Sequence, residues 1–370
     1  MTRRRFILLL EQIGISAAVA ETLYPFAAAR AAAGGEMPAG YWHPVKDGVE
    51  CELCPRQETL ANGETGTCHV RVNRRGRLVT LGYDRPCVLN IDPIEKNPLA
   101  HVHPGAELLA IAHAGCNIHC PYCQNWQFSQ KGPDQTKNIA DFDRAAVITK
   151  AAQRKLKGLA FTYTEPSVTP EFIAAAAQSA ADKGLLLTLC SCGYILDKPL
   201  RDMVKPFSAV TITYKGATEQ FYHDVCGASL KPVLDSMAAV KSLGKWLEVA
   251  TLVVPTLNDD TKLLASMARW IVQNLGPDTP WHLERFNPQH ELTNLPMTPQ
   301  TTLETVRKIG LDAGLKFVYI SNLAPHEGNH TYCPRCHAAV ITRLGFKIIR
   351  NDLRDGACPN CRIRLPGIWT

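Results

Sequence analysis

The feature that most constrains the fold is an alternation of apolar and amphipathic segments over residues 107–322. Short apolar runs predict strands, and segments whose apolar residues recur every three or four positions predict helices. Strands that alternate with helices of this length are typical of parallel βαβ units. About six or seven units are too few to close an eight-unit barrel, so we expect an α/β fold with a partial (βα)6 TIM-like barrel. A doubly wound open sheet is the alternative.

The expected elements follow one another with short connections. Strands are expected at 107–113, 159–163, 185–189, 208–213, 246–254 and 281–285, and a last one ends at 320. Helices are expected from about 143, at 170–183, at 231–242, up to 275 after a cap at Asp259 or Asp260, and from 299. In both architectures the chemistry collects at the C-terminal ends of the strands.

The loop after the first of these strands holds three cysteines in a CxxxCxxC spacing. Cys116, Cys120 and Cys123 follow a tight turn at Gly115, and Tyr122 precedes the third cysteine. Ordinary electron-transfer clusters use four cysteines, so a three-cysteine grip on a [4Fe–4S] cluster leaves one iron open to a substrate. The alternatives are chance and a structural zinc knuckle, although zinc sites favour paired CxxC units and four ligands.

The C-terminal segment contains a second cysteine pattern, CxxC…CxxC. Its members are Cys333, Cys336, Cys358 and Cys361, and residues 339–349 between them are expected to form a β-hairpin that turns at Leu344 and Gly345. Two such knuckles place four sulfurs tetrahedrally, which predicts a zinc ribbon. A mononuclear iron or a further cluster is the alternative.

A third group, Cys51, Cys54 and Cys68, has one CxxC and no clear fourth ligand. His69 or Cys87 could complete a site, and zinc, an auxiliary cluster and an unligated turn all stay open. The remaining cysteines are single residues in apolar or loop contexts, where buried small hydrophobic residues are expected; these are Cys87, Cys190, Cys192 and Cys226.

Fourteen cysteines, ten of them in three metal-like groups, predict a reduced metalloprotein and not a disulfide framework. The net charge of +6 is concentrated in the tail, where seven Lys or Arg follow Pro325 against three acidic residues. This tail is expected to be a solvated surface, and contact with an acidic protein or a nucleic acid is the alternative.

The chain is expected to divide into four parts. Residues 1–35 resemble a twin-arginine export signal or a disordered leader, with Arg3, Arg4 and Arg5 before an apolar stretch that Glu11 interrupts. A cysteine-containing module at 36–105, a core at 106–325 and the ribbon at 326–370 follow. No other run is long enough to span a membrane. A cytoplasmic location is expected, with periplasmic export as the alternative.

Several motifs resemble the AmmeMemoRadiSam-system radical S-adenosylmethionine (SAM) enzymes, which are similar to the pyruvate formate-lyase type of glycyl-radical activating enzymes. The matching strings are CELCPR at 51–56, GTCHVRVN at 66–73, DPIEK at 92–96, GCNIHCPYCQNW at 115–126, FTYTEP at 161–166, PWHLERF at 280–286 and PGIW at 366–369. The resemblance covers nearly everything after about residue 40.

The resemblance implies roles for particular residues. Cys116, Cys120 and Cys123 would hold a catalytic [4Fe–4S] cluster, and the signature aromatic residue Tyr122 would stand with the cofactor-binding residues. Glu165 would accept the SAM amine, although a Glu before a proline also starts helices. Lys215 would pair with the SAM carboxylate, and His282 would face the SAM ribose.

The chain departs from the activating enzymes at positions that matter. Thr213 stands where they have an acid, and residues 190–193 (CSCG) replace another acid followed by Thr-Asn-Gly. Hydroxyl and thiol groups suit a hard cation poorly, so we do not expect a Na⁺ or K⁺ site beside SAM. Glu58 stands near the usual place of another cysteine in the N-terminal module.

The resemblance therefore implies that the cluster cleaves SAM to a 5′-deoxyadenosyl radical, which abstracts hydrogen from an unidentified substrate. A ferredoxin or flavodoxin would supply the electron, and a protein or nucleic acid is a candidate substrate. A narrower alternative is a glycyl-radical enzyme activase. A non-catalytic zinc-ribbon module that binds nucleic acid or protein is the alternative from another class.

Overall fold

The centre of the molecule is one eight-stranded sheet, seen in a computed structural model that describes residues 36–369. The leader expected at 1–35 lies outside these residues. The strands are β7 (Pro86–Pro93), β8 (Glu107–His113), β9 (Gly158–Phe161), β10 (Leu186–Ser191), β11 (Ala209–Thr213), β12 (Trp246–Val253), β13 (Trp281–Arg285) and β14 (Val318–Ser321). Neighbours from β8 to β14 pair in parallel and in chain order. This order has no reversal, which confirms the partial barrel and excludes the doubly wound sheet.

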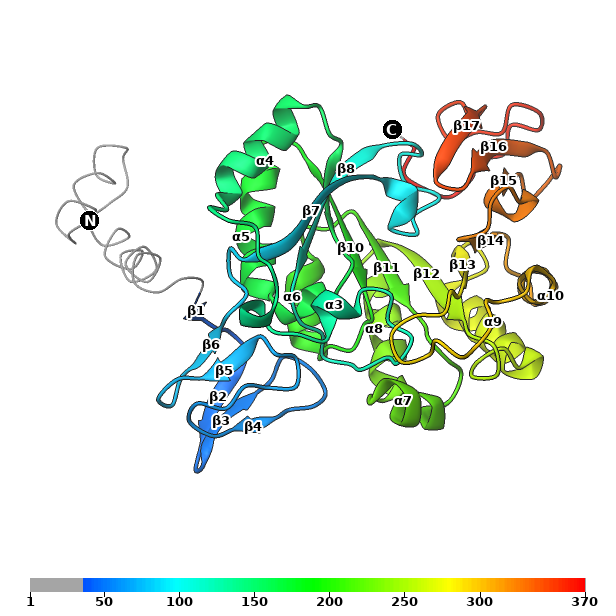
Figure 1. The fold of residues 1–370 in the computed structure, drawn as a ribbon. Helices are drawn as coiled ribbons and strands as arrows, with labels where there is room; N and C mark the ends of the chain where they lie inside the picture. The colour runs from blue at the N-terminus through cyan, green and yellow to red at the C-terminus, as the bar shows by residue number, and fades with distance from the viewer. Residues whose placement is uncertain (1–35, 370) are drawn as a thin grey trace.

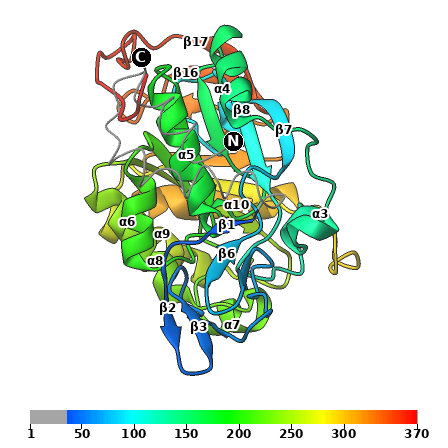
Figure 2. The ribbon, with the colours of Figure 1, turned by 90° about the vertical axis from the view of Figure 1, so that its left-hand side faces the viewer.

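Most of the helices lie along the outside of this sheet (Figures 1 and 2). The described helices are α3 (Trp126–Ser129), α4 (Arg144–Gln153), α5 (Pro170–Ala181), α6 (Asp197–Val204), α7 (Glu219–Cys226), α8 (Leu230–Ser242), α9 (Thr261–Leu275) and α10 (Gln300–Asp312). Short 3-10 turns are η1 (Ile94–Lys96), η2 (Pro133–Gln135), η3 (Pro166–Val168) and η4 (Glu327–Asn329). Asp260 caps α9 by accepting from the backbone amides of Lys262 and Leu263. This confirms one of the two predicted caps.

Strand β7 and helices α3, α6 and α7 were not predicted. Strand β7 pairs antiparallel with β8 and forms one edge of the sheet. Its sequence contains two prolines, an aspartate and an asparagine, which are residues that strands disfavour. Helices α6 and α7 have eight residues each, too short for a clear helical period.

Small sheets flank the core on both sides. The N-terminal sheets are β1 (Met37–Pro38) with β6 (Leu78–Thr80) and β5 (Arg71–Asn73), and β2 (Trp42–Val45) with β3 (Gly48–Cys51) and β4 (Thr59–Leu60). At the other end, β15 (Thr331–Tyr332) pairs with β16 (Ala339–Leu344), which pairs with β17 (Lys347–Asn351). This confirms the predicted hairpin. The division into parts stays a prediction. Across residues 36–369, no helix has the length and apolar character needed to cross a membrane.

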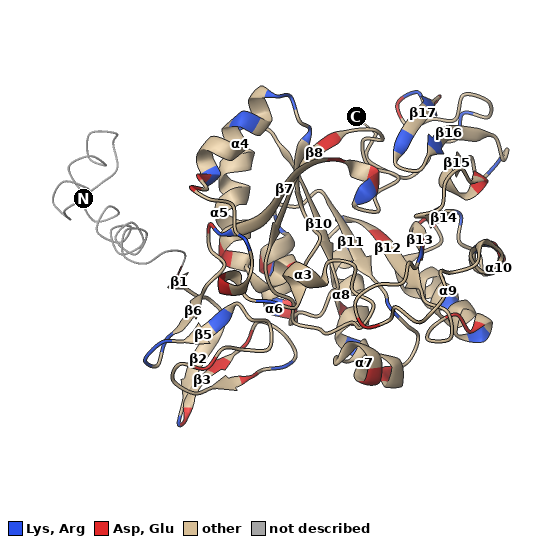
Figure 3. Cartoon of the chain, in the orientation of Figure 1, with Lys and Arg blue, Asp and Glu red and all other residues tan. Residues whose placement is uncertain are grey.

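The basic tail is less exposed than its composition suggests. Figure 3 shows Lys and Arg on β16 and β17. Arg343 of β16, however, is 5 % exposed and its guanidinium lies 3.7 Å from the Glu95 carboxylate. It donates to the Thr331 hydroxyl and to the Asn329 and Ala100 carbonyls. One of the seven tail cations therefore fastens the ribbon to the barrel.

A buried polar layer closes the barrel near the N-terminal ends of its strands. Glu248 of β12 accepts from the amides of Ala100 and His101, from the Trp246 indole, and from His282 Nε2 at 2.6 Å. Burial opposes ionisation of Glu248, but these donors, led by His282, hold its pKa at about 2. We call this layer around Glu248 the floor of the barrel, because it lies at the other end of the strands from their C-terminal ends.

Candidate active site

The three cysteines of the CxxxCxxC lie on the loop that leaves β8. The turn before them needs glycine, because Gly115 has φ 99° and a Cβ there would come within 2.4 Å of the Cys68 carbonyl and 2.3 Å of Val70. The N-terminal module therefore packs directly against the start of this loop. The Gly115 amide also donates to the Phe128 carbonyl, which holds the loop closed against α3.

Cys116, Cys120 and Cys123 all line one cavity of about 330 Å³. The C-terminal ends of six core strands supply the opposite walls, as predicted for a barrel of this kind. Their lining residues are Thr162 after β9, Cys190 of β10, Thr213 of β11, Leu252 of β12, Glu284 of β13 and Ser321 of β14. The volume lies in the range of small-molecule sites, about 300–1,000 Å³.

The three cysteines of this loop have distinct surroundings. Contact with Cys226 lowers the pKa of Cys120 to about 6, against the effect of burial and with help from the Lys215 charge. A lowered pKa favours the thiolate, the form that binds metals. Cys116 lies beside Cys192, whose thiol donates to the Asn117 side chain, and the Cys123 sulfur lies 3.1 Å from the Ser129 hydroxyl.

Cys192 and Cys226 were predicted to be buried small residues, and both are buried. Each also contacts a cysteine of the CxxxCxxC loop, which the sequence did not reveal because the partners lie 76 and 106 positions away. Their place beside the site is therefore a property of the fold and not of a motif.

Tyr122 and Lys215 meet in the same cavity. The Tyr122 hydroxyl lies 3.6 Å from the Cys226 sulfur, and the Lys215 ammonium lies 6.0 Å from the centre of the Tyr122 ring. Burial opposes the charge on Lys215, but the neighbouring Cys120, Cys226 and Cys192 sulfurs raise its pKa. Among the described residues, no hydrogen bond or ion pair engages this ammonium group, so it is available to an anionic ligand.

Glu165 lines the cavity but has its oxygens engaged. One oxygen accepts from the Ser167 amide at 3.0 Å and from the Ser191 hydroxyl at 2.7 Å, and the other accepts from the Cys192 amide at 2.7 Å. The Ser167 bond caps η3. The structure thus shows the helix-starting role and leaves the predicted SAM contact untested.

His282 lies apart from the cysteines. It is 3 % exposed, bonds Glu248 in the floor layer and stacks on Tyr319 with ring centres 5.1 Å apart. It is not among the residues that line the cavity with Cys116, whereas Glu284, two positions later on the same strand, is. Sequence reasoning missed Glu284, although a charged residue inside an apolar strand was a usable signal.

The departures from the activating enzymes cluster together in space. Cys190, Ser191, Cys192 and Thr213 all face the cavity. The Ser191 hydroxyl donates its hydrogen bond to Glu165. Burial raises the pKa of Cys190 to about 12, which keeps this side chain a neutral thiol. These groups suit a hard cation poorly, and the absence of a cation site here stays a prediction.

Sequence reasoning also missed a group of three polar side chains in the cavity wall. The Lys96 ammonium lies 2.9 Å from the Asp92 carboxylate and donates to the Tyr163 hydroxyl at 2.8 Å, and that hydroxyl donates to Asp92. Tyr163 has φ 69°, and its carbonyl accepts from the Asn125 amide group beside the cluster loop. Such left-handed backbone in a bulky residue is typical of functional sites.

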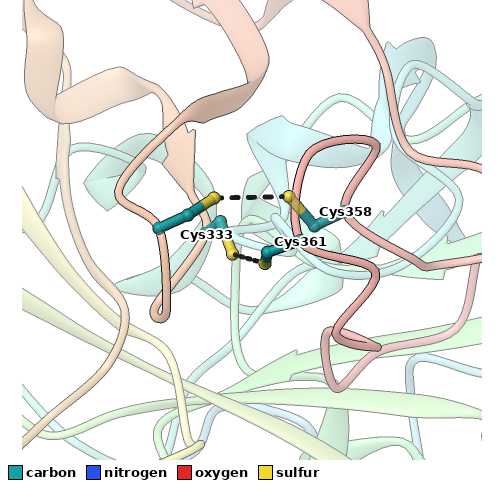
Figure 4. A group of neighbouring side chains, drawn as sticks. Cys333, Cys358 and Cys361 are labelled. Carbon is teal, nitrogen blue, oxygen red and sulfur yellow. Dashed lines mark hydrogen bonds between the residues drawn. The ribbon is translucent and has the colours of Figure 1, made fainter.

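The C-terminal cysteines form a compact site of their own. Ligand atoms of Cys333, Cys336, Cys358 and Cys361 all lie within 4.8 Å of one another, which is the only such group of three or more among residues 36–369. The Cys333 sulfur lies 3.4 Å from the Cys361 sulfur (Figure 4), and the Cys336 sulfur lies 3.6 Å from the Cys358 sulfur. The four thiols can hold one metal ion, as the spacing predicted.

The N-terminal cysteines meet in a small separate cavity. Cys51, Cys54 and Cys68 line it with Glu58 and Arg71. Burial raises the pKa of Cys54 to about 12 and of Cys68 to about 11, so these thiols are protonated. Metal binding there stays a prediction.

The two residues suggested as completing the N-terminal site lie elsewhere. The His69 ring packs edge-on against His119. The Cys87 sulfur lies 3.6 Å from the Ala112 carbonyl across the β7–β8 pair. Neither residue lines the cavity of Cys51, Cys54 and Cys68. Sequence proximity to Cys68 suggested His69, but its positive φ of 62° marks a backbone turn at this position.

Comparison with known proteins gives one family. Residues 111–268 match the Radical SAM superfamily. The uncharacterized protein MJ0808 of Methanocaldococcus jannaschii is 40% identical over 315 residues, which cover 85% of this chain and 93% of that protein. Among solved structures, a radical SAM methyltransferase from Sphaerobacter thermophilus is 14% identical, with 87% of this chain and 94% of that chain covered and a TM-score of 0.48. A domain of a pyruvate-formate lyase-activating enzyme from Bacteroides vulgatus is 15% identical, covers 45% and 99%, and has a TM-score of 0.39.

Proposed function

The chain belongs to the radical SAM superfamily, and we propose that Cys116, Cys120 and Cys123 hold the [4Fe–4S] cluster that its radical SAM chemistry requires. When bound, this cluster supplies the electron that cleaves SAM to a 5′-deoxyadenosyl radical, which abstracts a substrate hydrogen. One observation carries the proposal: the three thiols open into a single cavity of about 330 Å³. A fully ligated structural site would instead turn its sulfurs toward one another.

The residues present fit these cofactors. Three cysteines are one fewer than an electron-transfer cluster uses, which leaves an iron for a small ligand. The unengaged Lys215 ammonium supports a contact with the SAM carboxylate, because charge-assisted hydrogen bonds of this kind are strong. Tyr122 packs beside the Cys226 sulfur and the Lys215 ammonium group, and it shields the cysteine loop from water.

The substrate is proposed to enter on the side of Lys96 and Phe346. Lys96 belongs to η1 and Phe346 follows β16 in the ribbon, and both line the cavity. The ribbon and the N-terminal module thus border the route to the cysteines, which supports a large substrate such as a protein or nucleic acid. Activation of a glycyl-radical enzyme is the narrower version of this proposal.

Further parts of the proposal concern the metal of the ribbon, the electron donor and the cellular location. Zinc is proposed for the four ribbon cysteines, because tetrahedral thiolate sites prefer it. A ferredoxin or flavodoxin would deliver the electron. Because low-potential electrons and SAM are supplied in the cytoplasm, the enzyme is proposed to work there.

The test is anaerobic reconstitution with iron and sulfide, followed by incubation with SAM and dithionite. The wild type is expected to show charge-transfer absorption near about 400 nm and to release 5′-deoxyadenosine, and Cys120→Ala is expected to lose both. Cys87→Ala is the matched control, since Cys87 is a buried thiol outside the cavity. Uptake of zinc alone at the three cysteines would favour the non-catalytic binding module.

A further inference from the structure

Strand β13 presents two polar side chains to the inside of the barrel at different depths. Trp281 and Leu283 alternate with them and belong to the apolar core, where Trp281 packs on Gly310 of α10. His282 pairs in register with Tyr319 at the floor, and Glu284 pairs with Ser321 one layer higher. The period of two therefore places His282 below the cavity and Glu284 in its wall.

Glu284 is the carboxylate of this wall that the protein leaves unengaged. Asp92, Glu165 and Glu284 are the acidic residues that line the cavity. Asp92 is bonded by Lys96 and Tyr163, and Glu165 by three donors from η3 and β10. No hydrogen bond or ion pair within residues 36–369 engages Glu284. Burial raises its pKa, and a ligand that donates hydrogen bonds to it would stabilise its charged form.

The position of Glu284 relative to Lys215 limits what the ligand can be. Lys215 presents an unengaged cation and Glu284 an unengaged acceptor to the same cavity, and the Lys215 charge acts on Glu284. A molecule that fills the cavity between them must carry an anionic group toward Lys215 and hydrogen-bond donors toward Glu284. SAM carries a carboxylate at one end and two adjacent ribose hydroxyls further along.

We infer that the Glu284 carboxylate binds the ribose hydroxyls of SAM, a role that the family resemblance assigns to His282. Carboxylates at strand ends bind ribose hydroxyls in dinucleotide-binding folds by the same donor–acceptor match. His282 has its Nε2 committed to Glu248 and lines a small neighbouring cavity of about 30 Å³, whereas Glu284 lines the cavity of the cysteines. The inference rests on the proposed use of SAM by the cysteine loop.

The test is anaerobic calorimetric titration of the cluster-loaded protein with S-adenosylhomocysteine and with its 2′-deoxyribose counterpart. The wild type is expected to bind the ribose form at least about 10-fold more tightly, since hydrogen bonds to charged groups are strong. Glu284→Ala is expected to lose this discrimination, and Glu284→Gln to keep a part of it. Glu107→Ala removes an exposed acid at the opposite end of β8 and is the matched control.

The outcomes separate this inference from the function it rests on. The role of Glu284 would be overturned if Glu284→Ala still bound the ribose form more tightly than the 2′-deoxyribose form. It would also be overturned if His282→Asn lost this preference while Glu284→Ala kept it. Circular dichroism and the cluster absorption verify that each variant is folded and loaded. A wild type that binds neither compound and forms no 5′-deoxyadenosine would instead overturn the proposed function.

Discussion

The two best-defined cysteine groups of this chain use the same side chain in opposite ways. In the ribbon, four sulfurs from two knuckles lie within 4.8 Å of one another. On the loop after β8, three sulfurs face a cavity that they share with Lys215 and Glu284. The ribbon site is closed by its own ligands, and the loop site is open to a small molecule.

This difference teaches that ligand number and surroundings decide what a thiolate site does. Closed four-ligand sites contribute folding energy, whereas catalytic metal sites keep a position for a substrate. The open site also holds several groups with a perturbed pKa, which is lowered in Cys120 and raised in Lys215 and Glu284. Perturbed groups of this kind concentrate at functional sites.

Removing a ribbon ligand should have the largest effect on metal content and leave the open site intact. Cys358→Ala is expected to lose the ribbon metal, since binding of structural zinc to peptides is worth about 10 kcal/mol or more. Metal analysis should show the loss of one ion per chain, while iron and the absorption near about 400 nm stay. Loss of iron together with the ribbon metal would contradict the claim that the two sites bind their metals independently.

Cutting the link between ribbon and barrel should have the next largest effect. Arg343→Met is expected to lower the free energy of unfolding by about 3–5 kcal/mol, because it leaves Glu95 buried without its cation. Chemical denaturation measures this change. Arg350→Met is the control, because that side chain is exposed on β17. Equal effects of the two changes would contradict an anchoring role for Arg343.

Acid should loosen the attachment of the ribbon at its C-terminal end. Burial lowers the pKa of His101 to about 4, and its ring donates to the Pro366 carbonyl near the C-terminus. The unfolded chain takes up this proton first, so the contribution of His101 to stability is complete above about pH 6.5 and falls as the pH drops to 4, by up to about 3 kcal/mol. Hydrogen exchange should rise in residues 331–369 over this interval. Exchange in these residues that stays constant over the interval would contradict this role of His101.

The smallest effect is expected at the tip of the ribbon. Ile349 of β17 is 59 % exposed. Ile349→Ser should therefore change the free energy of unfolding by no more than about 0.5 kcal/mol, as surface substitutions usually do. Thermal unfolding measures the change. A large loss of stability would show that this strand is covered by a partner.

Local patterns predicted much of this molecule. Strand β13 has the predicted bounds, and the ribbon hairpin turns where Gly345 suggested. Edge strand β7 was missed because its partner pairing, and not its composition, makes it a strand. Motif spacing likewise placed Cys116, Cys120 and Cys123 at a strand end.

The rest of the site depends on long-range pairing that spacing does not encode. Whether His282 or Glu284 faces the cavity is a matter of depth along one strand, set by the register of β13 with β14. The contact of Cys226 with Cys120 depends on how α7 packs against the loop. Both features could be recognised only in the structure.

The most direct test asks whether one iron lacks a protein ligand. The reduced, cluster-loaded protein is mixed with SAM labelled with ¹⁵N at its amino group and studied by electron–nuclear double resonance. A ¹⁵N coupling to the cluster is the predicted result, and it should vanish when unlabelled SAM is used. A cluster that shows no such coupling, with protein side chains on all four irons, would contradict the account.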